Sequence, residues 1–215
     1  MTLEQVLQNA GSYTDQEATT PTGTDLTTRI SYANRALNEW ADFDDWEELT
    51  STYSFAVTGV SGIASSLNLP STFRKPMSPL ALYEASQPTL YEIVPMDERL
   101  SLNPAEEWCY ISGDVSQGYT LNIPKGLSSG VSAIMDIQSF PTSLASLTDV
   151  LPMKSGDYVA QRIISLVLES RGDSRFPTAK AEADNKLYAM GEAQNAKNIG
   201  MNNQIPMDKS FRIGE

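Results

Sequence analysis

The segment Gly126–Gly130 of this 215-residue chain matches the G-x-S-x-G pattern that surrounds the nucleophilic serine of many hydrolases. A serine in such a turn becomes reactive only when a neighbouring base removes its proton. The chain contains no histidine, which excludes a Ser-His-Asp triad. The segment is therefore predicted to be a glycine-bounded hairpin turn.

Glu106 and Glu107, next to Trp108, are the best local candidates for acid chemistry. Hydrolysis of a glycosidic bond requires two carboxyl groups at a fixed separation, and a neighbouring aromatic ring can raise the pKa of one of them. Adjacent residues of a strand point to opposite faces, however, so both carboxyl groups could not serve one site. A peptidoglycan-degrading glycan hydrolase is therefore kept as an alternative function.

Histidine and cysteine, the usual ligands of zinc, are nearly absent from the sequence. Without histidine, and with Cys109 as its single cysteine, the chain cannot form a conventional zinc site. The carboxylates of Asp42, Asp44 and Asp45 are suited to calcium, but an EF-hand loop counted from Asp42 would need glycine and glutamate where Glu47 and Tyr53 stand. We predict no catalytic residues, no cofactor and no bound metal, and a buried, unreactive Cys109.

The composition is that of a globular protein, with 40% hydrophobic and 20% charged residues. The net charge of −12 argues against binding nucleic acid by neutralising its phosphates, although an acidic wall would let DNA slide through a channel without adhering. No apolar stretch approaches the roughly 18 residues of a membrane span. The first residues lack the features of a signal peptide, so we expect synthesis in the cytosol and no contact with a membrane.

The N-terminal part of the chain shows helical periodicity. Residues 2–9 are predicted to form a short helix in which Thr2 and Gln5 make a capping box, followed by a loop over residues 11–23. A longer helix is expected to start with Thr24 or Asp25 as its cap and to end near Phe43. Its apolar residues recur at spacings of three and four, which places them on one face: Leu26, Ile30, Ala33, Leu37 and Trp40.

From Leu49 the period changes to two, which is typical of a half-buried strand. Residues 49–57 and 65–69 are expected to pair as a hairpin, and Arg74 and Lys75 to lie in a solvated basic turn after Pro70. Further strands are predicted at 79–84, 90–94, 108–112, 119–123 and 131–138, with a short helix at 97–102. This spacing indicates an antiparallel sheet or small sandwich.

The helical period returns after Pro152. A helix capped by Ser155 or Asp157 carries apolar residues on several sides and is expected to be central, and a second helix begins at Thr178 and ends at Gly200. The predicted fold is α+β: a small bundle of the N-terminal helix and a C-terminal helical hairpin, with an inserted antiparallel sheet or sandwich and an extended C-terminal arm. The predicted parts are residues 1–48, 49–150, 151–200 and 201–215.

Two short runs carry a resemblance to a known family. The first is RISYANRALNEW at residues 29–40, followed by Trp46, and the second is LPSTFRK at residues 69–75. Together with the order of the predicted elements from residue 26 to residue 208, they resemble the head-to-tail connector, or adaptor, proteins of tailed bacteriophages. The resemblance implies a structural virion protein, assembled in the host cytoplasm, that forms a ring of twelve copies beneath the portal.

The C-terminal arm is the expected site of partner binding. It spaces apolar residues among polar ones, as a segment that folds on a partner requires, namely Met201, Ile205, Met207, Phe211 and Ile213. The resemblance implies that this arm binds the portal protein, that a tail or nozzle protein binds below the ring, and that packaged DNA passes through the channel. A β-sandwich binding module of the tail or baseplate remains open beside the glycan hydrolase.

Overall fold

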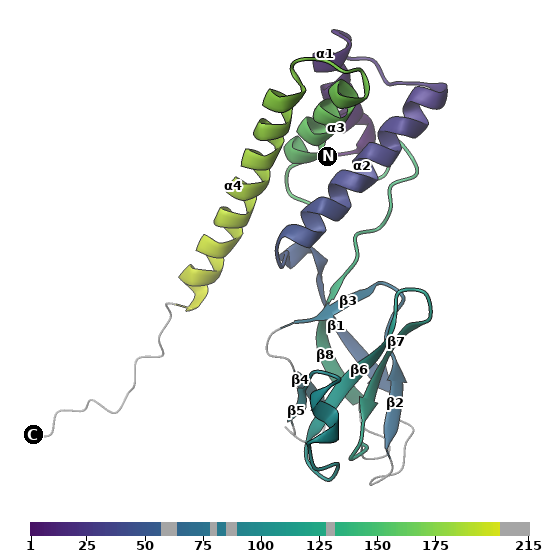
Figure 1. Ribbon diagram of the computed structural model, residues 1–215, viewed down its shortest axis with the longest axis vertical. Helices are drawn as coiled ribbons and strands as arrows, with labels where there is room; N and C mark the ends of the chain where they lie inside the picture. Colours follow the sequence, from purple (N-terminus) through teal and green to yellow (C-terminus); the bar gives the residue numbers. More distant parts are fainter. Residues whose placement is uncertain (57–63, 78–80, 85–89, 128–131, 203–215) are drawn as a thin grey trace, which may run out of the picture. The chain divides into compact units, whose positions relative to one another are not determined.

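The computed structural model describes residues 1–56, 64–77, 81–84, 90–127 and 132–202. The fold is α+β, as predicted, and the chain divides into two compact units (Figure 1). The first unit combines Met1–Asp44 with Ser143–Glu215 and contains the described α-helices, whereas the second unit, Asp45–Thr142, contains the described strands. The β-rich unit is thus inserted into the helical one.

Helix α1 (Leu3–Thr14) starts with the predicted capping box, in which the side chain of Thr2 and that of Gln5 each accept a backbone N–H of the other residue. The helix continues five residues past the predicted end at Asn9, because Leu3, Val6, Leu7 and Ala10 give it a fully buried face that offsets the weak helix propensity of Gly11. The predicted loop over residues 11–23 is therefore shorter.

Helix α2 (Gly23–Phe43) ends where expected, but its predicted cap is wrong. Thr24 and Asp25 lie inside the helix, and Thr22 occupies the N-cap position without a side-chain hydrogen bond. The predicted apolar face is buried at Ala33, Leu37 and Trp40. This face packs against helix α3.

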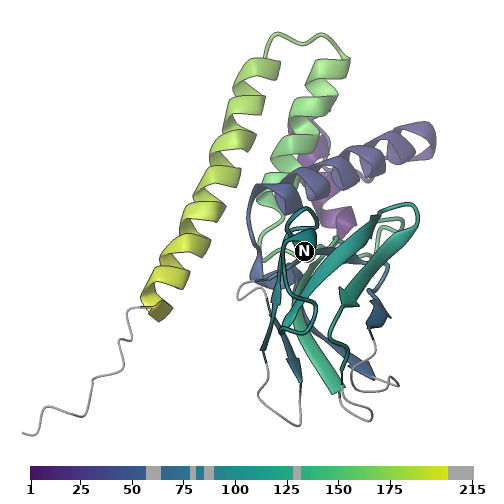
Figure 2. The ribbon, with the colours of Figure 1, turned by 60° about the horizontal axis from the view of Figure 1, so that its bottom comes forward.

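Helix α3 (Asp157–Ser170) is the centre of the helical unit, as its apolar circumference predicted. Every residue from Tyr158 to Leu168 is buried, because α1, α2 and α4 all pack against this helix. Helix α4 (Phe176–Asn202) lies beside α3, as Figures 1 and 2 show, and buries Ala179 and Ala183. It starts two residues before the predicted Thr178 and passes through Gly200, so the prediction that Gly200 ends the helix is wrong.

The second unit contains eight described strands and two short 3-10 helices, η1 (Glu47–Leu49) and η2 (Glu98–Leu100). The strands are β1 (Thr50–Ala56), β2 (Ser65–Asn68), β3 (Phe73–Pro76), β4 (Ala81–Glu84), β5 (Leu90–Ile93), β6 (Trp108–Asp114), β7 (Gly118–Ile123) and β8 (Ser132–Ser139). They form a hydrogen-bonded path in the order β1-β8-β4-β5-β6-β7-β2, and β3 also pairs with β8. All of these pairs are antiparallel except β5 with β6, which is parallel.

Two predictions for this unit are wrong. Strands β1 and β2 do not form a hairpin, because β1 pairs with β8 and β2 pairs with β7. Arg74 and Lys75 lie in strand β3 rather than in a turn, because the ring of Phe73 is buried in the core and aligns this segment with the end of β8. One edge of β8 therefore pairs with β1, and its other edge pairs with β3 and β4 in succession.

The strands enclose a hydrophobic core that includes Phe55, Phe73, Leu121, Ile123 and Met135. Cys109 is fully buried within it, as predicted, and burial raises the pKa of its thiol to about 12. Such a thiol is not ionised at neutral pH and does not act as a nucleophile. Among the described residues, no helix combines the length and the apolar character that crossing a membrane requires.

Candidate functional site

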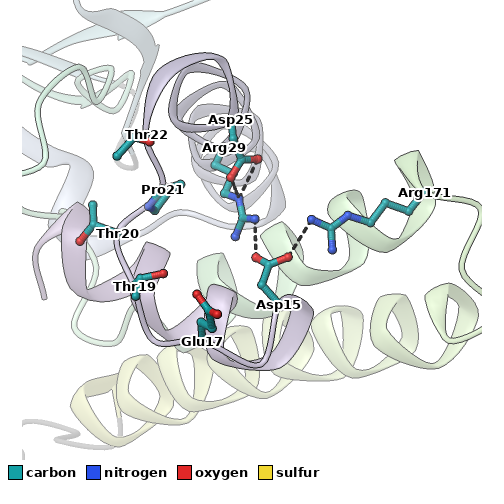
Figure 3. A pocket seen from close by; sticks show the side chains of 9 residues that line it. All are labelled: Asp15, Glu17, Thr19, Thr20, Pro21, Thr22, Asp25, Arg29 and Arg171. Atoms are coloured by element: carbon teal, nitrogen blue, oxygen red, sulfur yellow. Dashed lines mark hydrogen bonds and ion pairs between the residues drawn. The ribbon is translucent and has the colours of Figure 1, made fainter.

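The helical unit contains a hollow of about 330 Å³ where the end of α1, the α1–α2 loop, α2 and the residue after α3 meet (Figure 3). It is lined by charged and hydroxyl side chains rather than by apolar ones: Asp15, Glu17, Thr19, Thr20, Pro21, Thr22, Asp25, Arg29 and Arg171. None of these residues was singled out from the sequence as a site.

The local chain conformation brings these side chains together. Asp15 is the C-cap of α1, and its backbone N–H donates to the carbonyl oxygen of Gly11. Gln16 then adopts a left-handed conformation with φ of 57°, which turns the chain back across α1. A Cβ atom on Gly11 would lie 3.0 Å from the carbonyl oxygen of Glu17, so any larger residue would push the returning loop outward by a few tenths of an ångström.

Asp15 lies between two arginines from different elements. One carboxylate oxygen is 2.5 Å from Nη2 of Arg29 on α2, and the other is 2.7 Å from Nη2 of Arg171, the residue after α3. Nε of Arg29 also bonds Asp25, one helical turn earlier. Only 2% of Arg29 is exposed, so its charge is neutralised within the fold by these two carboxylates.

The contacts of the cluster keep both Asp15 and Arg29 charged. Partial burial raises the pKa of Asp15, but the hydrogen bonds from Arg29 and then Arg171 outweigh it and lower that pKa to about 2. Burial of Arg29 disfavours its charge, yet Asp15 and Asp25 raise its pKa above the usual value. Neither group exchanges a proton near neutral pH. The cluster therefore ties α1, α2 and the end of α3 together rather than acting as an acid or base.

The carboxylates that suggested glycan hydrolysis are exposed and do not form a catalytic pair. Glu106 and Glu107 precede β6 instead of lying within a strand, so the argument from opposite strand faces does not apply to them. Glu107 forms an ion pair with Lys125, and this hydrogen bond lowers the pKa of the carboxyl group. A general acid needs a raised pKa, so the geometry gives this alternative no support.

The other sequence candidates are placed as follows. Asp42 lies in the last turn of α2, Asp44 is its C-cap, and Asp45 forms an ion pair with Lys75. In the part of the chain that the structure describes, no group of three or more acidic or cysteine side chains is arranged to hold a metal ion. Gly126 follows β7 with φ of 76°, as in a turn, whereas Ser128–Gly130 lie outside the described residues.

The predicted partner-binding residues lie at the end of the helical unit. Met201 belongs to the last turn of α4, which corrects its assignment to an extended arm. The other four, Ile205, Met207, Phe211 and Ile213, lie outside the described residues. Their predicted role is therefore not tested by the structure.

One contact of the charged cluster could have been predicted from the sequence. Asp25 and Arg29 are four residues apart on a predicted helix, a spacing typical of a surface ion pair. The contact of Asp15 with Arg171 joins residues that are 156 positions apart, and no local pattern reveals it. No family model matches this chain, and no curated protein matches it.

Proposed function

We propose that this chain is a structural protein of a tailed-bacteriophage virion, a connector that forms a ring of twelve copies between the portal and the tail. The C-terminal arm attaches each copy to the portal, and a tail or nozzle protein binds the opposite side of the ring. Packaged DNA is held in the channel and passes through it at ejection. The net charge of −12 suits a wall along which a polyanion moves without sequence-specific binding.

The observation that carries this proposal is the course of α4. This helix of 27 residues, about 40 Å long, is anchored to α3 through Ala179 and Ala183 and leads directly into residues 203–215. The described chain therefore ends on an anchored helix, and the segment proposed to bind the portal follows this helix directly in the sequence. This arrangement supports the assignment of Ile205, Phe211 and Ile213 to portal binding.

The charged contacts of the helical unit support a scaffold role. Asp15 joins α1, α2 and the end of α3, and Glu39 joins α2 to α3. These pairs link elements distant in sequence and involve groups with pKa values far from neutrality. They hold the helices of this unit to one another, which suits a structural subunit.

The second unit favours one alternative. It has its own hydrophobic core, so a β-sandwich binding module of a tail or baseplate remains the second candidate. The two functions differ in assembly, because a connector binds the portal as a ring whereas a binding module does not.

The mass of the protein in solution, measured with and without purified portal rings of the same virus, tests the proposal. A connector is expected to remain small alone and to bind the portal as a ring with a defined number of copies. A chain that stays monomeric at saturating portal concentration, with no mass added to the portal, would overturn the proposal. A zymogram against peptidoglycan serves as the control for the hydrolase alternative, with Glu107→Gln as the matched variant.

A further inference from the structure

The hollow of the helical unit contains a buried hydrogen-bond donor without an acceptor. The side chain of Arg29 is only 3% exposed. Its Nε bonds Asp25 and its Nη2 bonds Asp15, whereas its Nη1 makes no hydrogen bond with any described residue. Figure 3 shows Nη1 pointing into the hollow. A buried donor that lacks an acceptor costs free energy, so a water molecule or a ligand must supply the acceptor here.

Four other groups that line the hollow have hydrogen-bonding capacity that the described fold does not use. Nε of Arg171 makes no hydrogen bond with a described residue, although both of its other nitrogens do. The same holds for the hydroxyls of Thr19 and Thr22, and for the carboxylate of Glu17. These side chains surround one space in Figure 3. The hollow therefore offers unused donors and unused acceptors together.

The charges around the hollow nearly cancel. The guanidinium groups of Arg29 and Arg171 are paired with the carboxylates of Asp15 and Asp25, which leaves the single negative charge of Glu17. A carboxylate or phosphate ligand would lie beside three carboxylates. An ammonium ligand would lie beside two guanidinium groups and the positive end of helix α2. The hollow therefore favours a neutral ligand.

The unused groups also indicate the chemistry of that ligand. The arginine nitrogens require acceptors, the carboxylate of Glu17 requires a donor, and a threonine hydroxyl can be either. A ligand hydroxyl donates and accepts at once, so several hydroxyls on one ring match this set. Ligand pockets are usually lined by apolar side chains, but Pro21 is the one apolar residue in the described lining. The volume of about 330 Å³ is at the small end of ligand pockets, which suits a single ring.

We propose that this hollow binds a neutral, hydroxyl-rich ligand, namely a sugar ring. Nη1 of Arg29 donates to one hydroxyl of the sugar, and the carboxylate of Glu17 accepts from another. The hydroxyls of Thr19 and Thr22 and Nε of Arg171 bond the remaining oxygens. The ligand is a free sugar or the terminal sugar of a glycan chain, which share this chemistry. The inference goes beyond the proposed connector function and does not depend on it.

Saturation-transfer NMR of the full chain with single sugars tests this site. The probes are glucose, galactose, mannose and N-acetylglucosamine, with acetate and phosphate as charged comparisons. At least one sugar is expected to give a saturable signal, and the two anions are expected to give none. A disaccharide that ends in this sugar and binds at least as tightly would identify the terminal sugar of a glycan chain as the ligand. Weaker binding of the disaccharide would identify the free sugar.

Matched variants locate the binding in the hollow. Glu17→Ala removes the unpaired acceptor and is expected to weaken sugar binding at least about tenfold. Thr22→Val removes a hydroxyl that makes no capping bond, so it should leave α2 intact and weaken binding by a smaller factor. Glu192→Ala, at an exposed position of α4, is the control and should bind as the parent does. Circular dichroism verifies that each variant folds.

Three results would overturn the sugar site. The absence of a saturable signal from all four sugars would mean that the hollow holds only water. Binding of acetate or phosphate that becomes tighter in Glu17→Ala would mean that the hollow is an anion site. Sugar binding that neither Glu17→Ala nor Thr22→Val changes would place the sugar elsewhere on the chain.

Discussion

Glu39 on α2 and Arg162 on α3 form a two-pronged ion pair, with Nε of Arg162 2.7 Å from one carboxylate oxygen and Nη2 2.9 Å from the other. The side chain of Arg162 is 10% exposed and that of Glu39 is 31% exposed. The phenolic hydroxyl of Tyr158 also donates to Glu39, at 3.3 Å. The pair therefore fixes the position of α2 relative to the central helix α3.

Removing one partner of this pair is expected to destabilise the helical unit. Arg162→Met leaves the Glu39 carboxylate with Arg35 as its remaining counter-ion among the described residues. We expect a loss of about 2 kcal/mol in the free energy of unfolding, below the 3–5 kcal/mol typical of a fully buried pair. Urea denaturation measures it. The double variant Glu39→Met, Arg162→Met should lose less than the sum of the two single losses, and simple additivity would contradict the coupling.

The helix contacts show where sequence reasoning succeeds. The apolar circumference of residues 159–168 predicted a central helix, and the period of residues 26–40 predicted the face that packs on it, because both patterns repeat with the geometry of the helix itself. The pairing of strands is different. Period-two alternation identifies β1 and β2 but cannot say which strands are neighbours, so the expected hairpin was wrong and the parallel β5–β6 pair was not anticipated.

The charged hollow shows the same limit for a site. Asp15 was assigned to a loop, and its arginine partners come from two helical segments whose approach depends on the packing of α1 and α2 against α3. The inventory of residue types was more informative, because the missing histidine excluded a triad whatever the fold. Chemistry that is absent from a sequence can be excluded, whereas contacts between distant residues require the structure.

Asp15 gives the helical unit a specific response to acid. Its pKa is about 2 in the folded chain, against 3.8 for the unperturbed group, so its ionised form stabilises the fold at pH values above 3.8. This contribution is lost as the pH falls from about 5 to 2. We expect Asp15→Asn to be less stable than the parent by about 1 to 2 kcal/mol at pH 7, allowing for screening of a side chain that is 32% exposed.

The difference in the free energy of unfolding between the parent and Asp15→Asn should shrink as the pH is lowered from about 5 to 2. Thermal denaturation at a series of pH values measures it. Glu17→Gln is the matched control, because Glu17 lines the same hollow but makes no hydrogen bond with any described residue, and its substitution should be neutral. If the stability difference between the parent and Asp15→Asn stays constant down to about pH 2, the two arginines do not hold the Asp15 carboxylate in its charged form.

Trp40 is expected to be the most costly single truncation in the helical unit. It is fully buried on α2, the helix whose apolar face packs on α3. Trp40→Ala should lower the free energy of unfolding by about 3 to 5 kcal/mol because it leaves a large cavity. Phe43→Ala, three residues away and 36% exposed, is the control and should cost less. Equal melting temperatures for Trp40→Ala and the parent would refute this packing.

Substituting two glycines of the β6–β7 hairpin with alanine would distinguish the cost of an unfavourable backbone conformation from the cost of a steric clash. Gly113 has φ of 103°, and a Cβ atom there would lie 2.1 Å from the carbonyl oxygen of Gly118. Gly118 has φ of 84° with open space around it. Gly118→Ala should cost about 1 kcal/mol from conformation alone, whereas Gly113→Ala should cost at least about 3 kcal/mol. Chemical denaturation compares them, and equal losses would mean that the hairpin relaxes around the added methyl group.

Deleting residues 203–215 is expected to separate folding from attachment. The described part of α4 is anchored through Ala179, Ala183 and Gln194, all of them before the deletion. The truncated chain should therefore melt within a degree or two of the parent. Binding to portal rings should be abolished, since burial of one side chain such as Phe211 or Ile213 contributes about 1.5 to 3 kcal/mol. Twelve arms acting together would multiply that effect, because each bound arm raises the effective concentration of the next.

Point variants locate the effect within the arm. The double variant Phe211→Ala, Ile213→Ala should weaken attachment to the portal nearly as much as the deletion, because the remaining residues keep the length and charge of the segment. Gln204→Ala with Ser210→Ala is the matched control and should bind normally, since it alters only polar side chains of the same segment. Sedimentation of portal rings with each variant measures the bound copies. If the truncated chain saturates portal rings at the same concentration as the parent, the arm is not the docking element and the contact must lie on the helices.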